Sequence, residues 1–129
     1  MTTVVRFRAP AGSYALPVEH VTEVRSAAEL TPLPEPRAGV AGLMRRAGDA
    51  LTVLSVLGEP GAHIIVIDEG GLTFGLLVAE VTGVHTVADD QISPPPPGQD
   101  RVTVAGVLAA DDGLVLLLDS AALRERLTS

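Results

Sequence analysis

Apolar and polar side chains alternate in short runs from the start of the chain. In residues 4–8, Val5 and Phe7 alternate with arginines, and a second apolar run begins at Tyr14 after a break of small residues. A period of two residues is typical of a half-buried β-strand, and such a break favours a turn. The pattern therefore predicts two strands joined by a turn.

The spacing of apolar residues changes in the next segment. Val18, Val21 and Val24 recur at every third position, which predicts a short helical turn leading into a strand. Residues 27–37 then carry proline at three alternate positions. Because proline lacks an N–H donor and restricts the residue before it, this segment should be an extended connector over the surface.

Residues 40–56 have the pattern of a β-hairpin. Two apolar runs flank a polar break that contains Arg45, Arg46 and Gly48. Glycine adopts a positive φ without steric cost, and tight reversals between strands often require one. We therefore expect Gly48 to lie in the turn of this hairpin.

The second half of the chain repeats the pattern of the first at an offset of about sixty residues. The matching pairs are Tyr14 with Phe74, Leu16 with Leu76, Val18 with Val78, Val21 with Val81, Thr22 with Thr82, and Val24 with Val84. A proline-rich segment recurs at residues 94–97, and residues 104–118 repeat the hairpin. Two similar copies of four or five strands predict two small β-barrels or curled sheets with one core. The length of 129 residues fits one domain, with repeated halves at about 4–58 and 63–127.

The chain is expected to end in a short helix. Asp119 or Ser120 can cap its start, and Leu123 and Leu127 share one helical face. Two arginines near the end of this segment suit the negative end of a helix. The overall fold class is therefore mainly β with short helices, including a C-terminal one.

Composition and charge restrict the partners and the compartment. The net charge is −7, and all nine basic residues are arginines that are scattered apart from one pair, which argues against nucleic acid as a partner. There is no cysteine, so disulfides and thiolate metal sites are excluded. No apolar run reaches the ~18 residues of a membrane span, and the start of the chain lacks the pattern of a signal peptide. We expect a cytoplasmic protein with no direct membrane insertion.

No residue pattern indicates an enzyme. His20, His63 and His85 lack metal-ligand spacing, and Ser93, although it follows His85 and two aspartates, has no nucleophile elbow around it. Catalytic residues, metal ions and cofactors are therefore not expected.

Three further motifs have structural interpretations. Asp111, Asp112 and Gly113 lack the remaining ligands of a calcium loop, and a tight turn on Asp112 and Gly113 is expected instead. Residues 94–97 are interpreted as a connector rather than a ligand for a proline-binding domain. The glycine pair at 70–71 lacks the spacing of a phosphate loop.

The remaining candidate is a protein-binding surface. Arg45 and Arg46 are the best candidates from residue type alone, because arginine makes planar contacts with several donors and is enriched at interface centres. A solvated turn is the alternative interpretation, and the residues alone leave both open.

The order of motifs resembles the CheW-like domain, the coupling module of bacterial chemotaxis. The segments that carry this resemblance are residues 14–24, 33–43, 74–84, 92–95 and 104–119. The resemblance implies two five-stranded SH3-like β-barrel subdomains that share a hydrophobic core. It also implies a non-enzymatic adaptor that links the tips of methyl-accepting chemoreceptors to the regulatory domain of the histidine kinase CheA.

The resemblance assigns binding roles to particular positions. Carried over by position, the receptor-facing residues would be Val21, Glu23 and Val24, with Val81, Val84 and Val87 nearby in the second half. Self-association of two copies is left open.

The chain departs from the family at the first hairpin. Where the family reads Asn-Leu-Arg-Gly, this chain reads Arg45-Arg46-Ala47-Gly48, and Thr52 and Ser55 replace a later proline and aspartate. Strand side chains alternate between faces, so Arg45 shares the face of Ala47 about 7 Å away, and Arg46 points to the opposite face. Arg45 is thus the nearest substitute for the missing arginine. The departure also raises an alternative, a divergent CheW-like interaction module that serves another complex.

Overall fold

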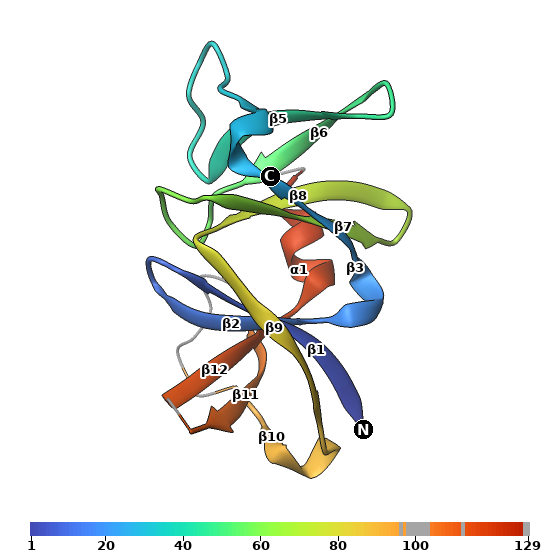
Figure 1. Cartoon of the computed structure of the whole chain (residues 1–129), viewed down its shortest axis with the longest axis vertical. Helices are drawn as coiled ribbons and strands as arrows, with labels where there is room; N and C mark the ends of the chain where they lie inside the picture. Colours follow the sequence, from blue (N-terminus) through green and yellow to red (C-terminus); the bar gives the residue numbers. More distant parts are fainter. Residues whose placement is uncertain (96, 98–103, 112, 128–129) are drawn as a thin grey trace.

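The computed structural model describes residues 1–95, 97, 104–111 and 113–127. Strands account for most of this described part (Figure 1). The strands are β1 (Thr2–Ala9), β2 (Gly12–Pro17), β3 (Val21–Ser26), β4 (Leu30–Thr31), β5 (Val40–Arg46), β6 (Asp49–Leu54), β7 (His63–Glu69), β8 (Leu72–Val78), β9 (Glu80–Val87), β10 (Ile92–Ser93), β11 (Val104–Ala110) and β12 (Gly113–Leu118). The helical elements are the 3-10 turns η1 (Val18–His20), η2 (Ala27–Glu29) and η3 (Asp89–Gln91) and the helix α1 (Ser120–Glu125).

The strands form two sheets of six. The first has the order β3-β7-β8-β6-β5-β4, and the second has the order β10-β11-β12-β2-β1-β9. We call them the first and the second subdomain; they lie one above the other along the long axis of the molecule (Figure 1). The predicted mainly β fold with two barrel-like units is confirmed. Each sheet holds one strand more than the expected five, because the two-residue strands β4 and β10 pair with β5 and β11.

The sheets do not follow the halves of the sequence. The two sheets nevertheless have equivalent strand orders. If each of β1 to β6 is exchanged with its counterpart among β7 to β12, the order of the first sheet becomes that of the second sheet read backwards. Each sheet therefore takes four strands from one half of the chain and two from the other. In the second sheet β1 pairs with β9, and in the first sheet β3 pairs with β7, so each pair joins strands from different halves of the chain. These long-range pairs join the two halves of the sequence within each sheet, so neither half of the sequence forms a complete sheet alone.

The hydrophobic core has a central part and one smaller part inside each subdomain. The central cluster includes Phe7, Leu16, Phe74, Leu76 and Leu123. Smaller clusters surround Met44 in the first subdomain and Leu108 in the second. Burying a leucine or phenylalanine contributes roughly 1.5–3 kcal/mol, so the shared central cluster is a strong physical reason for the subdomains to remain together.

The hairpin formed by β5 and β6 has the expected two-residue reversal. Arg46 pairs with Asp49, and the residues between them, Ala47 and Gly48, have φ of 50° and 88°. Positive φ at both positions is the signature of a type I′ turn. In the second hairpin Ala110 pairs with Gly113. The expectation for Asp112 falls outside the described residues, as does that for Pro96.

Replacing Gly48 with valine should destabilise the protein through the backbone alone. A Cβ at Gly48 would meet no atom within 4 Å, so no clash is involved. A β-branched residue in the left-handed region costs about 1–2 kcal/mol, and we expect a melting temperature lower by about 4–8 °C. Gly48→Asn is the matched control, because asparagine tolerates this conformation. Equal melting temperatures for the two variants would contradict this account.

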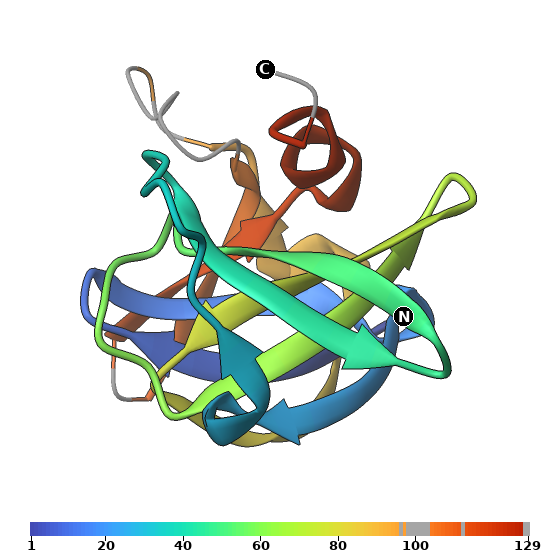
Figure 2. The ribbon, with the colours of Figure 1, turned by 90° about the horizontal axis from the view of Figure 1, so that it is seen from above.

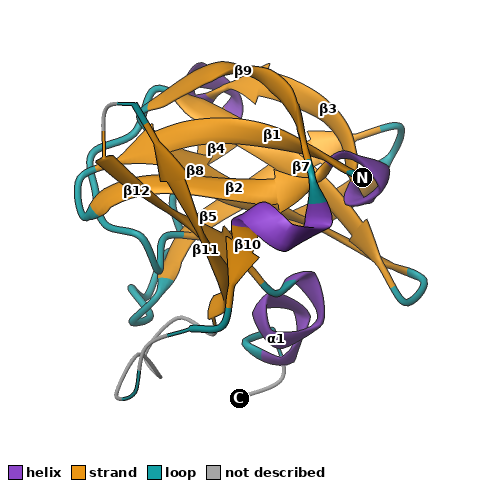
Figure 3. Cartoon of the chain, turned by 90° about the horizontal axis from the view of Figure 1, so that it is seen from below, coloured by secondary structure: helices purple, strands orange, loops and turns teal. Residues whose placement is uncertain are grey.

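The last helix begins as expected. The Asp119 carboxylate accepts hydrogen bonds from the backbone N–H of Ala121 and Ala122, so Asp119 rather than Ser120 is the N-cap. Leu123 is buried in the central cluster. Seen from above and from below, α1 lies on the side of the molecule opposite β3 and β9 (Figures 2 and 3).

Candidate functional site

Two edge strands present equivalent valines on one side of the molecule. β3 and β9 are the terminal strands of their sheets, and both lie on the side of the molecule opposite α1 (Figure 3). Val24 on β3 is 42% exposed and Val84 on β9 is 62% exposed. Because large aliphatic side chains are usually buried, two exposed valines at equivalent positions are a candidate interaction surface.

Strand alternation directs the other valines of the predicted site inward. Val21 and Val81 are partly buried and pack against the central cluster. Val87 packs against the core of the second subdomain. Of the six positions on β3 and β9, Val24 and Val84 are therefore the ones that offer exposed apolar surface. Val21, Val81 and Val87 support the strands from inside.

Glu23 belongs to a chain of ion pairs that crosses the first subdomain. Its carboxylate accepts a hydrogen bond from Nη1 of Arg25 at 2.6 Å and one from Nε of Arg46 at 3.1 Å. Arg25 also donates through Nε to Glu29 at 2.9 Å. β3 and β5 are separated by three strands in the order of the sheet, yet Glu23 and Arg46 meet. The sheet therefore curls until its ends approach, as a barrel requires.

The contacts with arginine lower the pKa of the Glu23 and Glu29 carboxyl groups. Hydrogen bonding from Arg25 is the main cause for Glu23 and Glu29 alike, and the contact with Arg46 adds to it at Glu23. The same contacts raise the pKa of Arg25. The four side chains are partly exposed, so the energetic value of the network is modest. Its main consequence is to fix the position of Glu23 and Arg46.

Arg46→Gln should raise the pKa of Glu23 while leaving it below the usual range, because Arg25 remains. NMR titration of the Glu23 carboxyl measures this. The folded-state pKa of Glu23 lies below the unfolded-state value, so its stabilising effect is present above the unfolded-state pKa and is lost as pH falls through the folded-state pKa. The difference in melting temperature between parent and variant should shrink from about pH 6 to about pH 3.

Arg45→Gln is the control for this prediction. It removes the same charge from the neighbouring position, but Arg45 is exposed on the other face of β5. An equal rise of the Glu23 pKa in both variants would show that long-range charge, rather than the direct contact, lowers it.

The two adjacent arginines thus differ in their surroundings. Arg46 lies on the same face of β5 as the buried Met44, which directs it across the barrel to Glu23. Arg45 and Gly48 are exposed at the hairpin. The structure brings Arg46 and Glu23 together, whereas Arg45 points away from them. Sequence reasoning missed the contact between Arg46 and Glu23, because this contact depends on closure of the barrel. The signal in the sequence that could have found it is that Arg46 lies on the same strand face as the apolar Met44.

The same end of the second subdomain carries different side chains and a pocket. Position for position, His85 replaces Arg25 and Ala110 replaces Arg46. A pocket of about 140 Å³ lies there, with Arg6 and His85 among its lining residues. The repeat in the sequence allows this comparison, but the sequence does not show that the smaller side chains leave a pocket.

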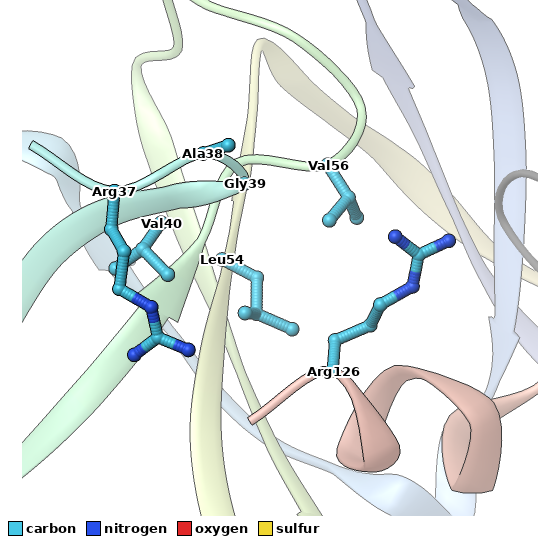
Figure 4. Close-up of a pocket in the computed structure, with 7 residues that line it drawn as sticks. All are labelled: Arg37, Ala38, Gly39, Val40, Leu54, Val56 and Arg126. Carbon is cyan, nitrogen blue, oxygen red and sulfur yellow. The ribbon is translucent and has the colours of Figure 1, made fainter. Parts of the chain in front are cut away.

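A smaller pocket lies between the first connector and the end of α1. Arg37, Val40, Leu54 and Arg126 are among the residues around it, and Arg126 extends from the helix end towards Val56 (Figure 4). Its volume is about 90 Å³, well below the roughly 300 Å³ at which ligand pockets begin.

The described residues contain no group of histidine, cysteine and acidic side chains that could bind a metal ion. Within the same part of the chain, no helix is long and apolar enough to cross a membrane. His20 Nδ1 lies 3.0 Å from Oε2 of Glu69.

Comparison with known proteins identifies the family. The family model described as "CheW-like domain" matches residues 3–127. Among solved structures, the chain is similar to the scaffolding protein TtCheW from Thermoanaerobacter tengcongensis, with 25% sequence identity and a TM-score of 0.83. That match covers 92% of this chain and 84% of the other. No curated protein matched the chain. Because the family model spans nearly the whole sequence and the architecture agrees, the chain belongs to the CheW-like domain family.

Proposed function

We propose that this protein is a non-enzymatic adaptor of chemotaxis-type signalling that couples chemoreceptors to the histidine kinase CheA in the cytoplasm. The match to the CheW-like family model over residues 3–127 is the observation that carries this proposal. The similarity to a CheW scaffolding protein over most of both chains supports it. An adaptor needs separate surfaces on one rigid body, and two subdomains with a shared core provide such a body.

The surface assigned to the receptor is the side formed by β3 and β9. Val24 and Val84 offer apolar contact area there, whereas the Glu23 side chain extends from the other face of β3, where Arg25 and Arg46 fix it. A fixed carboxylate loses little conformational freedom when a partner binds, which favours a specific polar contact at Glu23. Val21, Val81 and Val87 act by supporting these strands.

The surface assigned to the regulatory domain of CheA is the hairpin of the first subdomain. Arg45 is exposed there, Gly48 permits the reversal, and Arg46 is fixed by Glu23. An arginine with several planar donors next to a rigid turn suits contact with carboxylates or carbonyls of a partner.

The test is a pull-down with the purified full chain as bait. A CheA regulatory domain and a chemoreceptor tip, both encoded in the same genome, are offered separately and together. We expect each to be retained. Retention of neither would remove the coupling function.

The hairpin also favours a second candidate, a CheW-like module that serves another complex. Ala47 occupies the place of the family's arginine at the tip of the turn, with φ of 50°. If the loss of this side chain abolishes coupling, Ala47→Arg should restore retention of CheA. If the parent protein retains CheA and Ala47→Arg does not increase this retention, the result would argue against the second candidate.

A further inference from the structure

The second subdomain carries an arginine on the inner face of its sheet. Arg6 on β1 is half-buried and shares a strand face with Val4, which belongs to the core around Leu108. Its counterpart sixty residues later is Val66, which is 0% exposed in the core of the first subdomain. A guanidinium group thus stands where the other subdomain has a fully buried aliphatic side chain. A charge in such surroundings is stabilised by an opposite charge, so this position favours contact with an anion.

The residue opposite Arg6 also differs from its counterpart in the first subdomain. β1 pairs Arg6 with Gly83 of β9, just as β7 pairs Val66 with Glu23 of β3. In the first subdomain the carboxylate of Glu23 accepts a hydrogen bond from Arg46, which crosses the end of the barrel. Glycine supplies no carboxylate at the equivalent position of β9, while Arg6 supplies a guanidinium. The two subdomains therefore place complementary groups at the same point of the barrel.

The pocket of about 140 Å³ in the second subdomain lies at this point. A Cβ at Gly83 would lie 3.3 Å from Nε2 of His85, so the imidazole leans over the residue that pairs with Arg6. Arg6 and His85 both line the pocket, and none of the described residues around it is acidic. The apolar part of its wall is formed by Val87, Leu108, Ala109, Ala110 and Val115.

These groups suit a carboxylate on a short aliphatic stem. The planar donors of a guanidinium match the two oxygens of a carboxylate, and an imidazole N–H can donate as well. The apolar wall covers the methylene groups of the stem. In the first subdomain the equivalent place is filled by a carboxylate, that of Glu23, which favours this anion over a larger one.

Size and charge indicate that the carboxylate belongs to a larger partner. The pocket is smaller than the roughly 300 Å³ at which ligand pockets begin, so it accommodates an end group rather than a whole ligand. The net charge of −7 and the exposed Asp111, in the turn after Ala110, oppose the approach of a free anion. A carboxylate on a protein has further contacts nearby that offset this repulsion.

We propose that this pocket binds the carboxylate of a glutamate or aspartate side chain of a partner protein, with Arg6 as the main donor. The carboxylate would take the place that Glu23 fills in the first subdomain. The proposal identifies the partner by its chemistry and does not rest on the coupling function.

The experiment is an NMR titration of the full-length protein with three probes. N-acetyl-glutamate amide presents the carboxylate on a blocked backbone, N-acetyl-glutamine amide is its neutral counterpart, and propionate is a free small acid. The amide signals of Thr86, Ala109 and Val115 report on the pocket. We expect the glutamate compound to shift these signals and the glutamine compound to leave them unchanged.

Three results of this titration would overturn the proposal. The first is no shift with the glutamate compound, and the second is an equal shift with the glutamine compound. The third is binding of propionate without binding of the glutamate compound, because the pocket would then exclude a carboxylate carried by a protein backbone.

Arg6→Gln tests the main donor. It should weaken binding of the glutamate compound about tenfold, because a hydrogen bond between charged groups is lost. Arg8→Gln is the matched control: Arg8 lies on the same face of β1, about 7 Å further along, and is exposed. At that distance the loss of charge should weaken binding by less than about threefold. Equal effects of the two variants would show that general charge, rather than Arg6, attracts the carboxylate.

Ala110→Leu tests the location of the site. Ala110 lines the pocket at the position equivalent to Arg46, and leucine there should fill the space and weaken binding more than about tenfold. Ala110 is only partly buried, so the variant should keep a dispersed amide spectrum and a melting temperature within about 3 °C of the parent. Unchanged binding in this folded variant would place the carboxylate outside the pocket and overturn the proposal.

Discussion

Gly42→Ala should cost about 3 kcal/mol of folding free energy, which corresponds to about 10 °C in melting temperature. A Cβ at Gly42 would lie 2.2 Å from the carbonyl oxygen of Thr31 and 3.1 Å from Cα of Pro32. Both contacts are with backbone, so no side-chain rotation relieves them. β4 would have to leave β5, which would also remove Leu30 from the core around Met44. Thermal unfolding followed by circular dichroism measures the loss.

Two other glycines provide graded controls for this prediction. At Gly106, the equivalent position in the second subdomain, the nearest contact would be Cγ2 of Ile92 at 2.6 Å. A side chain can move more easily than backbone, so Gly106→Ala should cost less than Gly42→Ala. At Gly71, with φ of 83° and no atom within 4 Å, alanine should cost only about 1 kcal/mol. A loss at Gly42 no larger than that at Gly71 would show that the connector yields at little cost.

This pair of glycines shows what the repeat in the sequence could and could not reveal. Ala-Gly at residues 41–42 and 105–106 is one of the motifs that suggest both the repeat and the family. Its physical reason is visible only in the structure: the short strands β4 and β10 approach too closely for a side chain. The two-residue strands themselves carry no period that a sequence pattern could detect.

Local features of the fold were predictable because their causes are local. The positive φ of Gly48, the turn before β3 and the N-cap at Asp119 each follow from a few adjacent residues. The exchange of strands between the halves was not predictable, because β1 pairs with β9 about eighty residues away. A repeat indicates two similar units but not which strands complete which sheet.

The same distinction applies to the candidate site. Side-chain alternation anticipated that Arg45 and Arg46 point to opposite faces. It could not indicate that Arg46 meets Glu23, because that contact requires the curl of the whole sheet. Likewise, Ser120 was a candidate cap in the sequence. Its burial depends on the packing of α1 on β7, a strand about fifty residues earlier in the chain.

The double variant Val24→Arg with Val84→Arg should abolish receptor binding and leave the fold intact. A valine buried at an interface contributes about 1.5 kcal/mol, so losing two costs about 3 kcal/mol, or about a hundredfold in affinity. Two arginines brought against an apolar partner surface add an unfavourable desolvation term. Val24 and Val84 are 42% and 62% exposed in the free protein, so the melting temperature should change by less than about 3 °C.

Leu114→Arg is the matched control for this variant. Leu114 is 67% exposed near the hairpin of the second subdomain, on β12 rather than on β3 or β9, and the substitution places one arginine at an exposed aliphatic position. Affinity for a chemoreceptor tip is measured by calorimetry for the parent and both variants. Near-parental affinity of the double variant would place the receptor elsewhere. An equal loss in Leu114→Arg would mean that added charge, rather than the side formed by β3 and β9, weakens binding. A loss confined to the double variant would identify the exposed valines of the two edge strands β3 and β9 as the receptor-binding surface.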